Sequence, residues 1–335
     1  MSYILKSSRI SPCSWSSQYE FGERSENIID FASRKLAPHQ GRDADYAALD
    51  VRIRLSFDAT NITSREVVSS LVASHMRLVY IVPEHREFMH SGYSSEPILA
   101  EAAASLLNDG HGGTIFPSIA SKGPDILAAA YGSDLLAPGE RGETVGRLLM
   151  TIAHDSVIMK GNPNLSTPEA IFHRPIRVID FLQHLFHSTY HEVILDAGPV
   201  KARRDSKTLR EAYKNAYLSF SHFARAGDVE AAKLGKINKL LLRGLALQCK
   251  STQKSIDMAI PVFFGDAENG HISEENTSVL QVQIRNRKQR ENERVNPDIV
   301  LVPKDGMPVL SLFLELGSEE SSVGTVSRDG VVTQP

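Results

Sequence analysis

The sequence predicts a protein of the α+β or α/β class, with a mixed central sheet in the C-terminal third and helices flanking it. Apolar residues recur at intervals of three and four through much of the first 245 residues, a spacing typical of amphipathic helices. From Gly244 onward, short apolar runs separated by Gly- and Asp-containing turns are typical of strands. The composition, with 41% hydrophobic and 23% charged residues, is that of an ordinary globular chain.

The first half is predicted to contain three helices and one strand. The helices are expected at 64–76, 97–108 and 138–160, and the strand at 78–82. The helix at 138–160 carries an apolar face, which we expect to pack against the sheet. That face consists of Val145, Leu148, Leu149 and Ile152.

The second half is predicted to begin with helices and to end in strands. Helices are expected at 176–186, 209–224 and 229–245, and strands at 255–264, 279–287 and 309–316, with 299–302 as a hairpin partner of the last. An aromatic stripe at helical spacing supports the helix at 209–224. The strand at 279–287 alternates strictly, with Leu280, Val282 and Ile284 on one face.

These elements suggest four segments. Residues 1–45 are polar and are expected to form a loosely ordered lead-in, and 46–136 an N-terminal α/β segment. Residues 137–317 form the principal domain, interrupted by a helical insertion at about 161–243, and 318–335 form a disordered tail.

The chain carries no sign of a membrane or secreted protein. No apolar run approaches the ~20 residues that span a bilayer, and the N-terminus lacks the apolar core of a signal peptide. The two cysteines, Cys13 and Cys249, make neither a disulfide framework nor a CxxC zinc motif. We therefore expect an intracellular protein, nuclear or cytoplasmic.

A net charge of −3 conceals a strongly uneven distribution. Residues 201–254 carry 13 basic and 4 acidic side chains, residues 255–284 carry five acidic and no basic ones, and residues 285–294 are basic again. Such asymmetry indicates contact with a polyanion such as nucleic acid, although a solvated helix face has the same signature. The residues expected to contact nucleic acid are Arg203, Arg204, Lys207, Lys236, Lys239, Arg287 and Lys288.

Two candidate sites rest on weak patterns. The glycine-rich segments fit neither a Walker A motif nor a dinucleotide fingerprint. His184, His187 and His191 share one face if a helix runs through them, and three imidazoles are a possible zinc ligand set. Histidines at a wet helix end are the plainer interpretation.

A third candidate site is formed by Glu143, Asp257, Gln283 and Arg285. Asp257 lies in an otherwise apolar strand, where a carboxylate is costly unless it is paired or binds a metal. Gln283 and Arg285 share one face of a later strand. If these strands are neighbours, Asp257 and Gln283 would hold Mg²⁺, and Arg285 would stabilise phosphate charge. The preceding helix adds Glu143 or Glu140.

This arrangement resembles the PD-(D/E)XK, or restriction-endonuclease-like, superfamily. In that resemblance Asp257 corresponds to the motif aspartate, Gln283-Ile284-Arg285 to the (D/E/Q)-x-K element, and Glu143 to the helix glutamate. The chain from about residue 94 to residue 317 is also similar to uncharacterised fungal proteins, and related domains occur in crinkler-type and transposon-derived proteins. The resemblance implies a restriction-endonuclease-like fold and Mg²⁺-dependent phosphodiester hydrolysis.

The motif departs from the family pattern at two positions. Arg285 replaces the lysine, and Gln283 offers a neutral oxygen that binds Mg²⁺ more weakly than a carboxylate. Three functions therefore remain open at this point: a nuclease-like protein with a partly degenerate site, a catalytically inactive interaction or effector protein on the same fold, and a zinc-dependent hydrolase. A purely structural Asp257–Arg285 pair is a further possibility.

Overall fold

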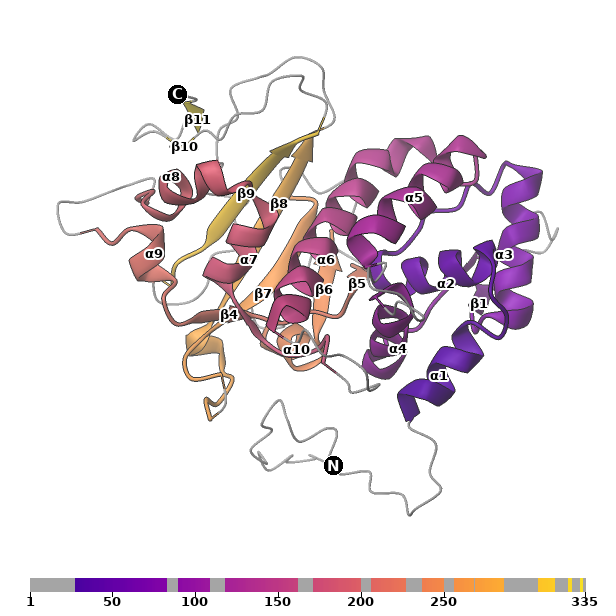
Figure 1. Ribbon diagram of the computed structural model, residues 1–335, viewed down its shortest axis with the longest axis horizontal. Helices are drawn as coiled ribbons and strands as arrows, with labels where there is room; N and C mark the ends of the chain where they lie inside the picture. Colours follow the sequence, from indigo (N-terminus) through magenta and orange to yellow (C-terminus); the bar gives the residue numbers. More distant parts are fainter. Residues whose placement is uncertain are drawn as a thin grey trace.

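Helices and a mixed β-sheet form the protein, as the computed structural model shows (Figure 1). The structure describes residues 28–82, 90–108, 118–161, 171–199, 206–226, 237–249, 256–267, 269–285, 307–316, 325–326 and 332–333. The helices are α1 (Ile28–Leu36), α2 (Arg42–Ile53), α3 (Ile62–Ser74), α4 (Pro97–Asn108), α5 (Ile119–Gly132), α6 (Arg141–Gly161), α7 (Val178–Leu185), α8 (His191–Leu195), α9 (Leu209–Ala212) and α10 (Ile237–Leu242). Within these ranges, no helix is long and apolar enough to cross a membrane.

The central sheet has seven strands and branches at β7 (Met258–Phe264). One edge of β7 pairs antiparallel with β6 (Leu245–Gln248) at its first residues and with β4 (Ala216–Leu218) at its last. The other edge pairs antiparallel with β8 (Thr277–Arg285). The sheet is completed by β5 (His222–Arg225), parallel to β6, by β9 (Leu310–Glu315), parallel to β8, and by β3 (Ile176–Arg177), antiparallel to β4.

Two short two-stranded sheets lie outside the central one. The first pairs β1 (Leu78–Ile81) with β2 (His90–Gly92), and the second pairs β10 (Thr325–Val326) with β11 (Val332–Thr333). The mixed central sheet with flanking helices confirms the predicted α+β class. Strands β7, β8 and β9 lie at the predicted positions, and β7 and β8 are neighbours, as expected.

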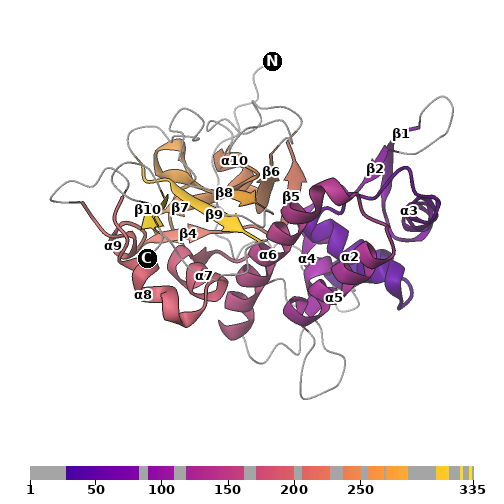
Figure 2. The same ribbon diagram turned by 90° about the horizontal axis from the view of Figure 1, so that it is seen from above.

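Helix α6 separates two hydrophobic cores. On one side, Met150, Ala153 and Ile158 pack with α7 and one face of the sheet, and on the other, Leu148 packs with the helices α2 to α5. The predicted apolar face is therefore only partly right, because Leu149 faces the sheet core while Val145 and Ile152 pack against the N-terminal core. Helix α10 covers the opposite face of the sheet (Figure 2).

Gly146 allows α6 to approach the sheet closely. A Cβ atom at this position would overlap the side chain of Ile284 on β8 and lie 3.0 Å from Met258 Cε on β7. The first turns of α6 thus lie directly against the two central strands, which places Glu143 at the end of the sheet.

One predicted helix is wrong, and a second is confirmed only over part of its length. The expected helix at 209–224 ends at Ala212, and the following residues form β4 and β5. The aromatic stripe fits either period, and pairing with β7 and β6 selects the strands. Within 229–245, only Ile237–Leu242 is described as helix, and Leu245 already begins β6. The supposed helical insertion therefore contributes three strands to the central sheet.

The loose lead-in expected over 1–45 is wrong for residues 28–45, because α1 and the first residues of α2 lie there. Buried charges hid α2 from a hydrophobic pattern: Asp50 and Arg52 are 4% and 0% exposed. The remaining lead-in and the hairpin strand at 299–302 lie outside the described residues. Most of the tail at 318–335, predicted to be disordered, also lies outside them, but β10 and β11 form a strand pair within it.

Candidate active site

The candidate site lies where several strands of the central sheet end beneath the start of α6. Asp257 directly precedes β7, and Gln283 and Arg285 are at the end of β8. The backbone register pairs Met258 with Val282, so Asp257 lies beside Gln283 on the adjacent strand. The backbone N–H of Asp257 donates to the carbonyl oxygen of Val282 at 2.9 Å. Asp257 thus lies opposite Gln283, and Arg285 follows two residues further along β8, on the neighbouring strand where it was expected.

Asp257 is held by a backbone contact from β8. Its Oδ2 accepts a hydrogen bond from the Ile284 N–H at 2.5 Å. Burial raises the pKa of Asp257 above its ordinary value, while this hydrogen bond and the charges of Arg285 and Arg147 act to lower it. A half-buried carboxylate with a raised pKa is a common feature of functional sites.

Glu143 approaches from the first turn of α6. Burial raises the pKa of Glu143, and the charge of Asp257 raises it further, which shows that the two carboxyl groups lie within electrostatic reach. Burial, together with the charges of Asp257 and Glu143, also raises the pKa of Cys249 to about 12. The end of the sheet is therefore a locally acidic environment in which negative charge is only partly compensated.

Two arginines, Arg147 and Arg285, offset part of that charge. Arg147, one turn after Glu143, is fully buried, and its Nη1 lies 3.9 Å from Glu143 Oε2. Its Nε and Nη2 donate to the carbonyl oxygens of Ile53 and Arg54, at 2.6 and 3.0 Å. Burial lowers the pKa of Arg147 to about 10, which leaves it charged at neutral pH. Arg147 ties the site to the end of α2.

Glu140 brings a third carboxylate to the start of α6. It lies in the 3₁₀ turn Pro138–Glu140 and accepts hydrogen bonds from Ser56 Oγ and, at 3.5 Å, from Gln248 Nε2. Its Oε1 also lies 3.5 Å from Nη2 of Arg225. Gln248 and Arg225 are the last residues of β6 and β5, so the site extends across two further strands.

The sequence pointed to Glu143, Asp257, Gln283 and Arg285, and the structure brings these together. It did not single out Arg147, Arg225 or Gln248, and it offered Glu140 only as a substitute for Glu143. A usable signal for Gln248 was its place as a polar residue at the end of the apolar strand Leu-Ala-Leu-Gln. The register of those strands, which decides whether their ends meet, is absent from the local pattern.

Asp257, Glu143 and Gln283 are the residues of this site that could hold a hard divalent cation. Asp257 and Glu143 are carboxylates whose raised pKa values a nearby cation would reverse, and Gln283 adds an amide oxygen. Gln283 is 4% exposed. Within the described ranges, no group of three or more His, Cys, Asp or Glu side chains is arranged to hold a metal ion, so this set depends on the neutral oxygen of Gln283.

The proposed zinc histidines do not share one helical face. Helix α7 ends at Leu185, and His191 begins the separate helix α8. Each imidazole has a local contact instead: His184 with the Asp180 carbonyl oxygen, His187 with Thr189 Oγ1, and His191 with the Phe186 carbonyl oxygen, at 2.8 to 3.0 Å. The broken helix removes the geometry on which the zinc prediction depended.

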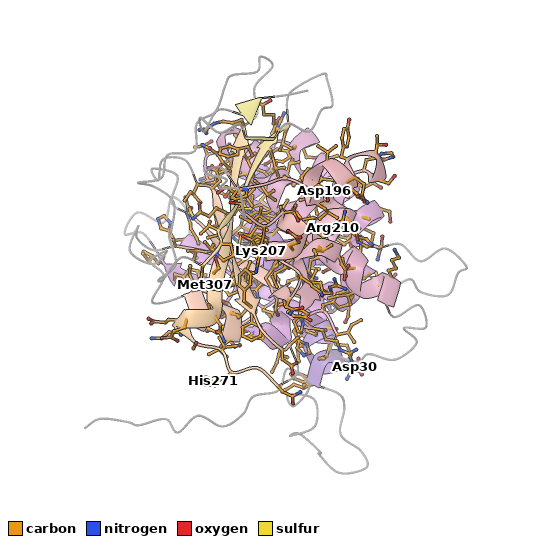
Figure 3. All side chains as sticks on the ribbon, turned by 90° about the vertical axis from the view of Figure 1, so that its left-hand side faces the viewer. Asp30, Asp196, Lys207, Arg210, His271 and Met307 are labelled. Carbon is orange, nitrogen blue, oxygen red and sulfur yellow. The ribbon has the colours of Figure 1, made fainter. Side chains whose placement is uncertain are left out.

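Of the seven basic residues predicted to contact nucleic acid, the structure describes two. Lys207 precedes α9 and Lys239 lies in α10, and both are exposed. Figure 3 shows Lys207 near Arg210, on the side of the molecule formed by α8 and α9, whereas α10 covers one face of the sheet (Figure 2). The two lysines thus belong to different parts of the surface. Arg203, Arg204, Lys236, Arg287 and Lys288 lie outside the described residues.

The chain matches a protein family that is described as a domain of unknown function, DUF8736. The family matches residues 58–297, more than half of the chain, and the chain is a member of it. The match includes Glu143, Asp257, Gln283 and Arg285. No curated protein and no solved structure matches the chain.

Proposed function

We propose that the protein binds nucleic acid and hydrolyses phosphodiester bonds with Mg²⁺ at the end of the central sheet. The observation that carries the proposal is the position of Asp257 beside Gln283 on the neighbouring strand, with Glu143 of α6 within electrostatic reach. The topology supports it as well. A helix bearing an acid precedes three antiparallel strands, β6, β7 and β8, and a strand parallel to the last. This order agrees with the restriction-endonuclease-like fold that the motif resembles.

Asp257, Glu143 and Gln283 would hold the cation. Bound Mg²⁺ supplies a Lewis acid and a more acidic water. Arg285 would stabilise the negative charge that develops on a phosphoryl oxygen. The hydrogen bond from the Ile284 N–H to Oδ2 restrains the orientation of the Asp257 carboxylate.

A second function rests on a specific observation, the two arginines. Arg147 and Arg285 already act to lower the pKa of Asp257, so the site has cationic partners built into the protein. Together with the neutral Gln283, this favours a site that has lost catalysis and retains binding. On this alternative the protein is an inactive interaction or effector module on the same fold.

Cleavage assays separate the two functions. We expect wild-type protein with Mg²⁺ or Mn²⁺ to cleave plasmid DNA or end-labelled single-stranded DNA or RNA, and Asp257→Ala to lose at least ~100-fold in rate. Asp125→Ala, an exposed acid on α5, is the matched control and should cleave normally. Arg285→Lys should preserve or raise the rate, since it restores the family residue.

Inactive wild-type protein would favour the binding module. Restoring the family pattern with Gln283→Glu and Arg285→Lys then tests descent from a nuclease, because the double variant regains a second carboxylate ligand and the lysine. If folded wild type and the double variant are both inactive with Mg²⁺ and with Mn²⁺, the catalytic proposal is wrong.

A further inference from the structure

We propose that Arg225, at the tip of β5, is a second phosphate contact of this site, so that a bound polynucleotide crosses the strand ends from β8 to β5. The inference rests on the proposed function. It adds the path that the polynucleotide follows across the sheet and the minimum length of polynucleotide that reaches both arginines. Arg225 belongs to none of the motif positions and lies at the opposite end of the acidic group from Arg285.

The first step is the alignment of strand ends. Strands β5 and β6 are parallel, β6 and β7 are antiparallel, and β7 and β8 are antiparallel. The ends of β5, β6 and β8 and the beginning of β7 therefore lie along the same border of the sheet. That border carries, in order, Arg225, Gln248, Asp257 and Arg285.

The second step is the span of this row. The register places Arg225 level with Gln248, Met258 and Val282, so Arg285 lies three residues further along β8. Three strand spacings of about 4.8 Å and three residues of about 3.3 Å separate the two arginine backbones by roughly 17 Å. A stacked nucleic acid strand advances about 3.4 Å per nucleotide, so this span corresponds to about five nucleotide steps. A ligand that contacts both arginines is therefore longer than a dinucleotide.

The third step concerns the exposure of Arg225 and its contact with Glu140. Its side chain is 48% exposed, and its contact with Glu140 joins Nη2 to Oε1 at 3.5 Å, a long distance for a charged hydrogen bond. Glu140 also accepts from Ser56 and Gln248, so it keeps neutral donors when a phosphate takes the guanidinium. The planar guanidinium suits bidentate contact with phosphate.

An ordinary surface ion pair is the competing interpretation, and the sheet offers a matched control for it. Arg177 on β3 is also 48% exposed and lies 4.0 Å from Asp180. It belongs to the strand beyond β4, away from the row of strand ends. Both pairs are expected to contribute little to stability. Of these two arginines, only Arg225 is expected to contribute to the binding of nucleic acid.

The experiment measures binding of 12-nucleotide and 3-nucleotide oligothymidylates by fluorescence anisotropy, in EDTA, between 50 and 200 mM salt. We expect Arg225→Ala to weaken binding of the 12-mer about tenfold and to reduce the slope of log K against log salt by about 0.7, the value for one phosphate contact on a single strand. Binding of the 3-mer should be unchanged, and Arg225→Lys should retain most of the slope. Arg177→Ala should bind both oligomers like wild type.

The outcomes distinguish this inference from the proposed function. If wild type binds the 12-mer and Arg225→Ala matches Arg177→Ala, the second contact is wrong and the proposed function stands. If Arg225→Ala weakens both oligomers equally, the residue acts on the site as a whole and the crossing path is wrong. Absence of wild-type binding overturns both proposals. Should Arg225→Ala fail to fold, Arg225→Gln replaces it, with the same expected loss of slope.

Discussion

Helix α6 carries two acidic side chains whose surroundings are opposite. Asp155, in the second half of the helix, is completely buried, yet its pKa lies below the ordinary value. Burial acts to raise this pKa, but the contacts with Arg52 and His154 lower it by more. Glu143, in its first turn, is more exposed and has a raised pKa. The more deeply buried carboxylate is the better compensated one, so burial alone does not explain the electrostatics of the site.

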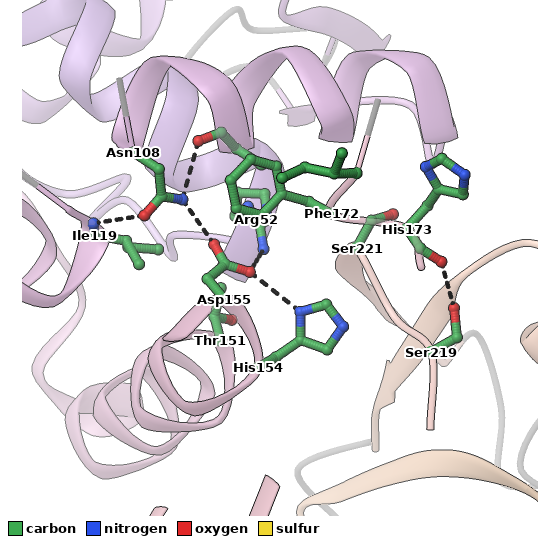
Figure 4. A network of polar contacts seen from close by, with 12 residues as sticks. Arg52, Asn108, Ile119, Thr151, His154, Asp155, Phe172, His173, Ser219 and Ser221 are labelled. Carbon is green, nitrogen blue, oxygen red and sulfur yellow. Dashed lines mark hydrogen bonds and ion pairs between the residues drawn. The ribbon is translucent and has the colours of Figure 1, made fainter. Parts of the chain in front are cut away.

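The surroundings of Asp155 account for its compensation (Figure 4). Arg52 Nη2 donates to Oδ1 at 2.7 Å, and Asn108 Nδ2 donates to Oδ2 at 2.9 Å. His154 Nδ1 lies 3.1 Å from Oδ1. Asn108 in turn accepts from the Ile119 N–H at 3.0 Å. The network joins α2, α4, α5 and α6, whereas Glu143 and Asp257 lack comparable pairing. The Asp155 cluster joins four helices of the fold, whereas the carboxyl groups of the other cluster keep raised pKa values.

The largest expected effect is the loss of the Asp155 network. Asp155→Ala leaves Arg52 buried without its carboxylate, and we expect it to lower the free energy of unfolding by about 3–5 kcal/mol in urea denaturation. Asp180→Ala, at an exposed ion pair, should change it by less than about 0.5 kcal/mol. Equal losses in the two variants would contradict the contrast between the clusters.

An intermediate effect is expected from acidification, through His222 at the same buried junction. Burial lowers the pKa of His222 to about 3, and the charges of Arg52, Arg243 and Arg54 act in the same direction. Its Nε2 and Nδ1 contact Ser95 Oγ and Ser221 Oγ, at 2.8 and 3.0 Å.

Because the unfolded imidazole titrates near pH 6.5, the unfolded state binds more protons below that pH, and stability falls as pH falls towards 3. We expect His222→Gln to remove up to about 1.4 kcal/mol per pH unit of this dependence, measured by urea denaturation between pH 6.5 and pH 4. The exposed His187→Gln serves as the control. A variant with the wild-type slope would show that other groups cause the acid sensitivity.

The smallest expected effect has the opposite sign. Glu143→Gln removes a carboxylate whose pKa is raised, so we expect it to stabilise the protein at pH 7 by less than about 1 kcal/mol. A raised pKa means that the native state binds the extra proton, so the gain should shrink as pH falls and wild-type Glu143 becomes neutral. Thermal denaturation at pH 7 and pH 5 measures this, with the exposed Glu66→Gln as control. A destabilised Glu143→Gln would show that the carboxylate is structural.

The same contrast explains what the sequence predicted and what it missed. Helices α3, α4 and α6 and strands β7, β8 and β9 have local periodicity and were predicted nearly to their ends. Helix α2 was missed because Asp50 and Arg52 occupy buried positions that a hydrophobic pattern reads as exposed. Strands β4 and β5 were missed because their partners, β7 and β6, come later in the chain.

The candidate site was predictable to the extent that its residues share a motif. Asp257, Gln283 and Arg285 lie on two consecutive strands, so alternation and spacing sufficed. Arg147 lies one turn from Glu143, but its burial depends on a long-range contact with Ile53, and Arg225 reaches the site only through a long-range contact with Glu140. No local pattern encodes such contacts.

The branching of the sheet at β7 also determines when the protein can acquire its site during synthesis. Strands β4, β5 and β6 emerge from the ribosome before β7, yet β4 and β6 both pair with it. Until β7 is made, β6 has an unpaired edge, and Glu143 faces no Asp257. Contacts of such long sequence separation form late in folding. A chain synthesised only as far as β6 therefore lacks the acidic pair, which forms only after Asp257 and the strands beside it have been made.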